Sequence, residues 1–174
     1  MFDCSEDDID IRFELTEDIS TALEKFNALE WNGKDYSEMQ EAISNLVKAI
    51  GEGLGLKDLP EIHITDSGVQ YGSYNYEFNT ITLNKRYFND PRELVDTISH
   101  ELRHAYQHMK AEYPVTLEDM MYRVNFDNYI SPLVLPAGGY LFFTDYYNQY
   151  VEVDARAFAN IISEYFFLSI FASL

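Results

Sequence analysis

The chain has 174 residues, of which 47% are hydrophobic and 24% are charged, and its formal net charge is −18. This length is typical of a single domain, and the hydrophobic content is sufficient for a buried core. The negative charge should repel nucleic-acid backbones and anionic membranes, so we expect no nucleic-acid partner. The simplest interpretation of the acidity is that it aids solubility. A basic protein partner or substrate, or mimicry of DNA, is the alternative. The only cysteine, Cys4, excludes an internal disulfide.

The first sixty residues are predicted to form one strand and two helices. Hydrophobic and charged residues alternate from Ile9 to Leu15, which indicates a strand. Residues 17–30 and 36–50 are predicted as helices, the second of which ends in a glycine-rich stretch. The first eight residues are acidic, whereas a secretory signal needs a basic start, so we expect a cytoplasmic protein.

A small sheet and a long helix are predicted next. Segments with strand-like composition cover residues 61–65, 69–77 and 79–84. The pair Asp90-Pro91 then suits the N-cap and first position of a helix that ends before Pro114. Helices followed by a small sheet, and then by further helices, are the pattern of an α+β fold.

The most specific motif lies in the middle of this helix: His100-Glu101-Leu102-Arg103-His104, which has the form H-E-x-x-H. Two histidines four residues apart share one face of a helix and can bind the same metal ion. The glutamate between them can act on a water at the metal. Of the other histidines, His63 is predicted to lie on a strand face. His108 is predicted as a polar surface residue, with support of a metal ligand as its alternative role.

A third ligand is expected downstream, because catalytic zinc takes three protein ligands. Residues 151–159 are predicted as a helix with Ala155 and Ala159 on its inward stripe. Glu152 continues this stripe one turn earlier, where a buried acid is costly unless it is paired or coordinated. We therefore prefer Glu152 and keep Asp154 as the alternate ligand, or as an acceptor that orients a ligating histidine. Both acids could instead only stabilise the N-terminus of the helix.

These residues resemble a known family. His100-Glu101-x-x-His104, followed by a glutamate on a second helix, resembles the zincin metallopeptidases of the gluzincin type. Glu152-x-x-Ala155-x-x-Phe158-Ala159 is similar to the E-x-x-A-x-x-F-A helix of the small ImmA/IrrE-like bacterial and phage metallopeptidases, in which the glutamate is the third zinc ligand. The resemblance implies a zincin-like fold, in which a small sheet packs against the H-E-x-x-H helix and a C-terminal helix that carries the ligand. With the chain length, it implies a single metallopeptidase-like domain over residues 1–174, with an N-terminal strand and helical extension (1–58) and a catalytic core (59–174).

The expected activity is zinc-dependent hydrolysis of a peptide or protein substrate. Zn²⁺ held by His100, His104 and Glu152 lowers the pKa of its water toward about 7. Glu101 then acts as the general base. An extended substrate is expected along the strand at 69–77, as an edge strand of the sheet. The negative oxygen that develops during hydrolysis needs a hydrogen-bond donor beside the zinc. The tyrosines between the two ligand segments are the candidates, and each could instead be a packing residue: Tyr140, Tyr146, Tyr147 and Tyr150.

Two alternative functions follow from the same residues. The chain could be an acidic interaction or inhibitory protein whose metal site is vestigial or structural. It could also be a metal-dependent hydrolase that acts on bonds other than peptides. Glu101 favours catalysis, because a structural site needs the two histidines but not the base between them.

Further predictions concern the C-terminal helix and two arginines. The apolar run at 161–171 contains Glu164 and is shorter than the about 20 residues of a membrane span. We therefore expect a buried helix that continues from Glu152, with a partner-binding helix as the alternative. Arg103 and Arg156 are expected to form surface ion pairs.

Overall fold

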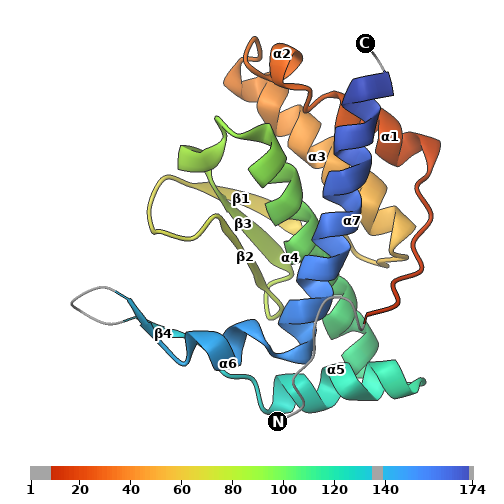
Figure 1. The fold of residues 1–174 in the computed structure, drawn as a ribbon, viewed down its shortest axis with the longest axis vertical. Coiled ribbons are helices and arrows are strands. Elements are labelled where there is room, and N and C mark those ends of the chain that lie inside the picture. The colour runs from red at the N-terminus through yellow and green to blue at the C-terminus, as the bar shows by residue number, and fades with distance from the viewer. Residues whose placement is uncertain (1–8, 135–138, 173–174) are drawn as a thin grey trace.

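The computed structural model describes residues 9–134 and 139–172, and its fold is α+β (Figure 1). Residues 1–8, which carry Cys4 and the acidic start, lie outside the described part. The elements are α1 (Glu17–Glu24), α2 (Ala28–Trp31), α3 (Tyr36–Gly53), β1 (Glu61–Thr65), β2 (Gly72–Asn75), β3 (Thr80–Asn84), the 3-10 turn η2 (Lys85–Tyr87), α4 (Pro91–Glu112), α5 (Leu117–Asp127), β4 (Leu133–Val134), β5 (Tyr140–Leu141), α6 (Phe143–Tyr147) and α7 (Tyr150–Ala172).

The N-terminal segment differs from its predicted structure. Within residues 9–16 no strand forms, and the extended chain instead places Ile11, Phe13 and Leu15 against the hydrophobic core. The Phe13 ring meets the Phe158 ring of α7 edge-on, with the ring centroids 4.9 Å apart. The strand prediction was wrong because alternating burial arises in any extended chain that lies on a core, with or without a hydrogen-bonded neighbour.

The first predicted helix, 17–30, is divided into α1 and α2. Thr16 caps α1 and Asn27 caps α2, each through a side-chain oxygen that accepts a hydrogen bond from the first turn. The second predicted helix, 36–50, is confirmed as α3 and begins with a capping box at Asp35.

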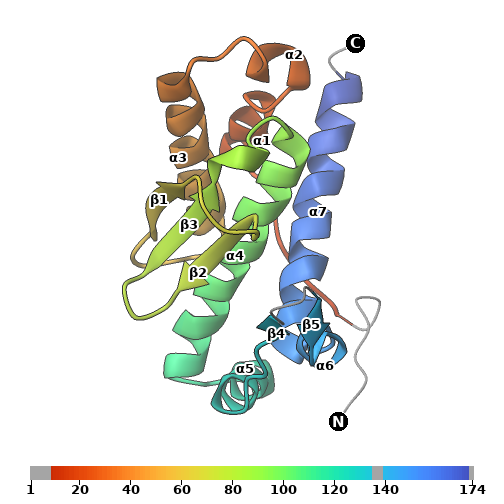
Figure 2. The ribbon, with the colours of Figure 1, turned by 90° about the vertical axis from the view of Figure 1, so that its left-hand side faces the viewer.

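The predicted strands form a mixed sheet in the order β1-β3-β2, with β1 parallel and β2 antiparallel to β3. Of the strand predicted over 69–77, only the segment Gly72–Asn75 (β2) forms a strand. Among the described strands, β2 has no neighbour on its outer side, so it is an edge of the sheet. A Cβ atom on Gly72 would lie 2.6 Å from Cγ2 of Thr97. The edge strand therefore lies directly on α4 (Figure 2), at Thr97, which is three residues before the first histidine of the motif.

The two longest described helices, α4 and α7, pack along each other, and the sheet lies beside α4 (Figures 1 and 2). Ala155 and Ala159 are buried, which fits the close approach of α7 predicted from these small residues. One hydrophobic cluster joins α1, α3, β3, α4 and α7. The N-terminal helices therefore share a core with the two helices that carry the H-E-x-x-H motif and Glu152.

Helix α7 is buried nearly all round from residue 151 to residue 159, and from residue 160 to residue 167 it is buried on one side. Ile162 and Phe166 are buried, whereas Glu164 and Phe167 are exposed, as predicted for a helix packed in the core. No helix within the described ranges has both the length and the apolar character that a membrane crossing requires.

Candidate metal centre

Helix α4 fixes the two histidines of the motif on one face. Asp90 caps the helix by accepting hydrogen bonds from two backbone N–H groups of its first turn, and Pro91 occupies the first position, as predicted. The Nε2 atoms of His100 and His104 lie 3.1 Å apart. Their side chains are 18% and 13% exposed, so the pair is reachable from solvent. Glu101, between them, is buried.

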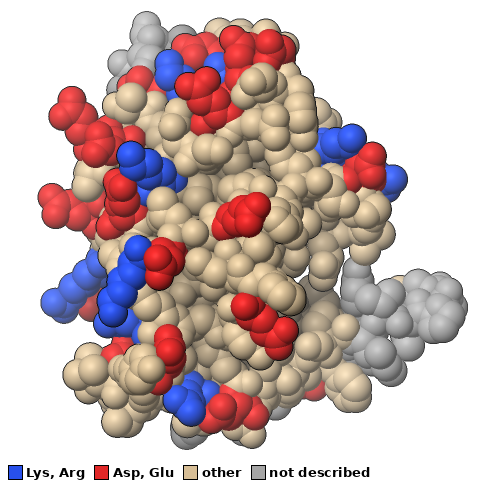
Figure 3. All heavy atoms as spheres, turned by 180° about the vertical axis from the view of Figure 1, so that it is seen from behind, with Lys and Arg blue, Asp and Glu red and all other residues tan. Residues whose placement is uncertain are grey.

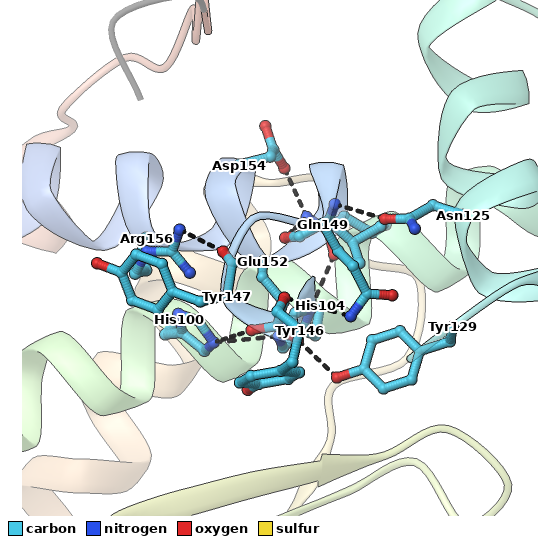
Figure 4. Close-up of polar contacts among 12 residues, drawn as sticks. His100, His104, Asn125, Tyr129, Tyr146, Tyr147, Gln149, Glu152, Asp154 and Arg156 are labelled. Atoms are coloured by element: carbon cyan, nitrogen blue, oxygen red, sulfur yellow. Dashed lines mark hydrogen bonds and ion pairs between the residues drawn. The ribbon is translucent and has the colours of Figure 1, made fainter. Parts of the chain in front are cut away.

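Helix α7 brings Glu152 to the same point (Figure 4). Its Oε2 lies 3.5 Å from Nε2 of His100, and its Oε1 lies 3.6 Å from Nε2 of His104. Zinc–ligand bonds of about 2.0–2.1 Å place tetrahedral ligand atoms about 3.3 Å apart. The three separations in the structure are close to this value, so these residues can hold a metal ion without a large rearrangement.

The pKa values of Glu152 and His104 are set by their burial and by the charged and hydrogen-bonding groups around them. Burial alone would raise the pKa of Glu152, but contacts with His100 and His104 outweigh it and hold this pKa well below its usual range. Burial likewise lowers the pKa of His104. The hydrogen bond and charge of Glu152, the charge of Glu101 and the hydrogen bond of Gln107 outweigh it and raise this pKa to about 9. A buried carboxylate thus faces two imidazole nitrogens, which is a favourable environment for a cation.

Asp154 belongs to a different group of contacts. It projects from α7 to another side than Glu152 (Figure 4), and its carboxylate accepts hydrogen bonds from Arg103 at 2.7 and 2.8 Å. Tyr122 and Gln107 donate to the same carboxylate, at 3.2 and 2.6 Å. The Asp154 carboxylate is therefore directed away from the three candidate ligands, and the side chain of Gln107 links it to His104. The surface ion pair predicted for Arg103 is wrong: this pair is buried, because both side chains lie at the contact between α4 and α7.

A tyrosine outside the predicted set makes the closest contact with the ligand group. The hydroxyl of Tyr129 donates to Oε1 of Glu152 at 2.6 Å. Of the predicted tyrosines, Tyr146 lies beside this pair, and burial together with Glu152 raises its pKa above the usual range. The same causes, burial first, raise the pKa of Tyr129. Two phenol hydroxyls therefore face the candidate centre.

The other predicted tyrosines lie elsewhere. Tyr147 is half-exposed and lies under the guanidinium of Arg156, whose Cζ is 3.5 Å from the ring centroid. Arg156 also donates to the backbone oxygen of Tyr147 at 2.7 Å. Tyr150 packs against Tyr122 in a second hydrophobic cluster. Tyr140 is in β5, and its side chain is outside the described part of the structure.

The segment between α4 and α7 is anchored next to the centre by amide side chains. Gln149 accepts a hydrogen bond from the backbone N–H of Ile130 at 2.7 Å and donates to the backbone oxygen of the same residue at 2.8 Å. Asn125 accepts from the backbone N–H of Val151 at 2.8 Å. These contacts fix the residue next to Tyr129 against the start of α7, which explains how a loop tyrosine reaches Glu152.

The two remaining histidines are not part of the group. His63 is exposed on β1 and lies 3.4 Å from Glu61, consistent with the predicted strand face. His108 was predicted as a polar surface residue, but its ring is stacked between Phe126 and Tyr76, with centroids 3.7 and 4.8 Å away. Burial, and then the charge of His104, lower the pKa of His108 to about 4. It therefore joins α4 to α5 and to the β2–β3 turn as a neutral aromatic ring.

No protein-family model, curated protein or solved structure matches the chain. The identification of a candidate metal site therefore depends on the geometry of His100, His104 and Glu152.

Proposed function

We propose that the chain is a zinc-dependent metallopeptidase, with Zn²⁺ held by His100, His104 and Glu152. One observation carries the proposal: two imidazoles from α4 and a buried carboxylate from α7 converge, and their ligand atoms are separated by 3.1, 3.5 and 3.6 Å. Imidazole nitrogen and carboxylate oxygen are the donors of catalytic zinc sites, which take three protein ligands and keep one open position.

Glu101 is the proposed general base. It lies in the same turn of α4 as the ligands but is not one of them, and its charge acts on both His104 and Tyr146. Zinc, when bound, supplies the Lewis acidity that lowers the pKa of a water to about 7. Glu101 accepts the proton of the attacking water and passes it to the leaving amine.

Tyr146 is the proposed donor to the oxyanion of the tetrahedral intermediate. Its raised pKa, caused by burial and by Glu152, keeps the hydroxyl protonated at neutral pH. A protonated phenol held near the reacting group can stabilise the negative charge that develops there. Tyr129 is already engaged with Glu152 and is better placed to hold this ligand than to contact a substrate.

The proposed substrate is an extended peptide that lies along β2. This strand is one of the two edges of the sheet, and it rests on α4 where Gly72 meets Thr97. An edge strand has unpaired backbone groups, which an added peptide strand can satisfy.

Metal analysis tests the proposal directly. The purified chain, equilibrated with zinc and freed of excess, should contain about one equivalent of zinc, as expected for a single three-ligand site. The His104→Ala variant, measured in parallel, should contain none. Absence of zinc from the wild-type chain would rule out the proposed function.

A non-enzymatic interaction protein is the second candidate, and the outer face of α5 favours it. Large apolar side chains are exposed on this helix and just before it: Tyr113, Val115, Leu117, Met120, Met121 and Val124. Exposed apolar surface of this kind marks interaction sites. The charge of −18 disfavours a second copy of the chain and favours a basic partner.

This candidate can be tested with a synthetic lysine- and leucine-rich amphipathic helix as the probe. Binding should weaken with added salt and should be lost when Leu117 and Val124 are replaced by Ser. A wild-type chain that does not bind the probe, but does bind zinc and hydrolyse peptides, would leave only the first candidate.

A further inference from the structure

Gln107 lies one turn after His104 on α4 and is fully buried. Its Oε1 is 2.8 Å from Nδ1 of His104. Its Nε2 donates to the backbone oxygen of Val151 at 2.8 Å and to Oδ2 of Asp154 at 2.6 Å. We propose that Gln107, oriented by Asp154, is a positioning residue that holds His104 in the tautomer that binds zinc. The inference rests on the zinc site proposed above.

The orientation of the amide follows from its partners. A backbone oxygen and a carboxylate oxygen can only accept hydrogen bonds, so the end of the amide that faces Val151 and Asp154 must be its NH₂ group. The amide oxygen therefore faces His104, and Nδ1 of that ring must carry the proton that it donates. In the neutral ring the lone pair is then on Nε2, the nitrogen that lies beside Glu152 and His100. The contacts thus select the tautomer that a metal ion in this group requires.

Asp154 supplies the negative charge behind the amide. Its carboxylate is fully buried and paired with the guanidinium of Arg103, and the hydroxyl of Tyr122 adds a further hydrogen bond. These partners fix the carboxylate in place. A fixed carboxylate that accepts from the NH₂ group polarises the amide, so its oxygen becomes a stronger acceptor for the Nδ1–H of His104. Partners of this kind orient a ligating histidine and increase its basicity toward the metal.

The alternative explanation is that these residues only join α4 to α7. Joining the helices accounts for the pair of Arg103 and Asp154, but it does not require a polar residue at position 107. A buried amide costs free energy unless each end is satisfied, and an aliphatic side chain would pack there without that requirement. The two explanations differ in one measurable respect: only the positioning role links Gln107 to zinc affinity.

The test compares Gln107→Met with Ser163→Ala. Ser163 also joins α7 to α4, through a hydrogen bond of 3.1 Å to Asp96, but it does not contact the candidate centre. Zinc affinity is measured by competition with a chromophoric chelator, and folding is followed by thermal unfolding of the zinc-free proteins. We expect Gln107→Met to bind zinc about 10- to 100-fold more weakly than wild type. Ser163→Ala should bind within about twofold of wild type, because distant sites act independently. Affinity of Gln107→Met within the same range would overturn the proposal.

A second measurement needs only the wild-type chain, and it decides the question if Gln107→Met fails to fold. In the ¹⁵N-labelled, zinc-loaded protein, NMR should show a slowly exchanging Nδ1–H proton on His104 and metal on Nε2. Metal on Nδ1, or absence of that proton, would overturn the proposal. A wild-type chain that binds no zinc would instead rule out the proposed function itself, so the two failures are distinguishable.

Discussion

At the scale of single residues, the hydroxyl of Tyr129 is the closest polar neighbour of Glu152, at 2.6 Å from its Oε1. A hydrogen bond to a buried carboxylate is worth more than a neutral one, about 1.5–3 kcal/mol. We therefore expect Tyr129→Phe to lower the free energy of unfolding of the zinc-free chain by about 1–3 kcal/mol in urea titrations. Tyr147→Phe is the matched control, because it removes the hydroxyl of a half-exposed ring that lies under Arg156. Equal effects of the two changes would contradict the importance of the Glu152 contact.

Glu101 should be needed for hydrolysis but not for zinc binding. Gln has nearly the shape of Glu but cannot accept the proton of the attacking water, so Glu101→Gln should retain about one equivalent of zinc while hydrolysis falls about 10²- to 10⁴-fold. Zinc content and the rate of cleavage of an unstructured protein substrate are measured on the same preparation. His104→Ala serves as the control that should lose both. Hydrolysis by Glu101→Gln at the wild-type rate would exclude Glu101 as the base.

The site residues that could be predicted from the sequence are those whose relative positions are fixed within a single helix. His100 and His104 are four residues apart on one helix, so their common face follows from helical periodicity alone. Glu152 could be proposed from its place on the inward stripe of a second helix. Tyr129 could not, because it reaches Glu152 only through the anchoring of Ile130 by a distant glutamine. Gln107 did carry a signal, since it is three residues after His104 on the same face.

At the scale of whole elements, the capping residues of α4 located its start, whereas alternation predicted β1 correctly and the segment at residues 9–15 wrongly. Asp90 and Pro91 mark the start of α4, and the structure begins this helix there. The alternation at residues 9–15 reported burial of one side but not strand pairing. Arg103 was placed at the surface because the sequence does not show that Asp154, on another helix, meets it in the core. Periodicity predicts which face of a helix is buried, but it does not predict which residues of another helix that face contacts.

The burial of His108 between Tyr76 and Phe126 should make the stability of the fold depend on pH. Its pKa is lowered to about 4 in the folded chain by burial and by the charge of His104, compared with 6.5 for an ordinary histidine. Between these values the unfolded chain binds a proton that the folded chain does not, so stability is lost as pH falls from about 6.5 toward 4. Its closest neighbours are the aromatic rings of Tyr74, Tyr76 and Phe126.

His108→Phe should preserve the stacking and remove this proton. From pH 7 to pH 4.5, the zinc-free wild type should lose about 2 kcal/mol more unfolding free energy than the variant does. Urea unfolding at the two pH values measures the difference. Parallel pH profiles of the two chains would show that His108 titrates alike in the folded and unfolded states, contrary to expectation.

At the scale of the whole molecule, the charge of −18 is distributed and not concentrated on the face shown in Figure 3. Many acidic side chains there lie along the edges, several of them beside lysine or arginine, and others stand singly amid uncharged surface nearer the centre (Figure 3). An excess of like charges destabilises the compact state by mutual repulsion. A divalent cation at the proposed centre would reduce the net charge and would join α4 to α7.

Zinc should stabilise the entire fold, because its proposed ligands lie on the two helices that share the hydrophobic core with α1 and α3. A ligand that binds only the folded state at 100 times its Kd adds about 2.7 kcal/mol to the unfolding free energy. For a chain of this length, each kcal/mol raises Tm by about 2–4 °C, so saturating zinc should raise Tm by about 5–10 °C. Differential scanning calorimetry of the wild type and His104→Ala, each with EDTA and with zinc, measures this shift. The wild type should show the full increase and the variant almost none. The same increase in both chains would place the stabilising metal outside the proposed centre.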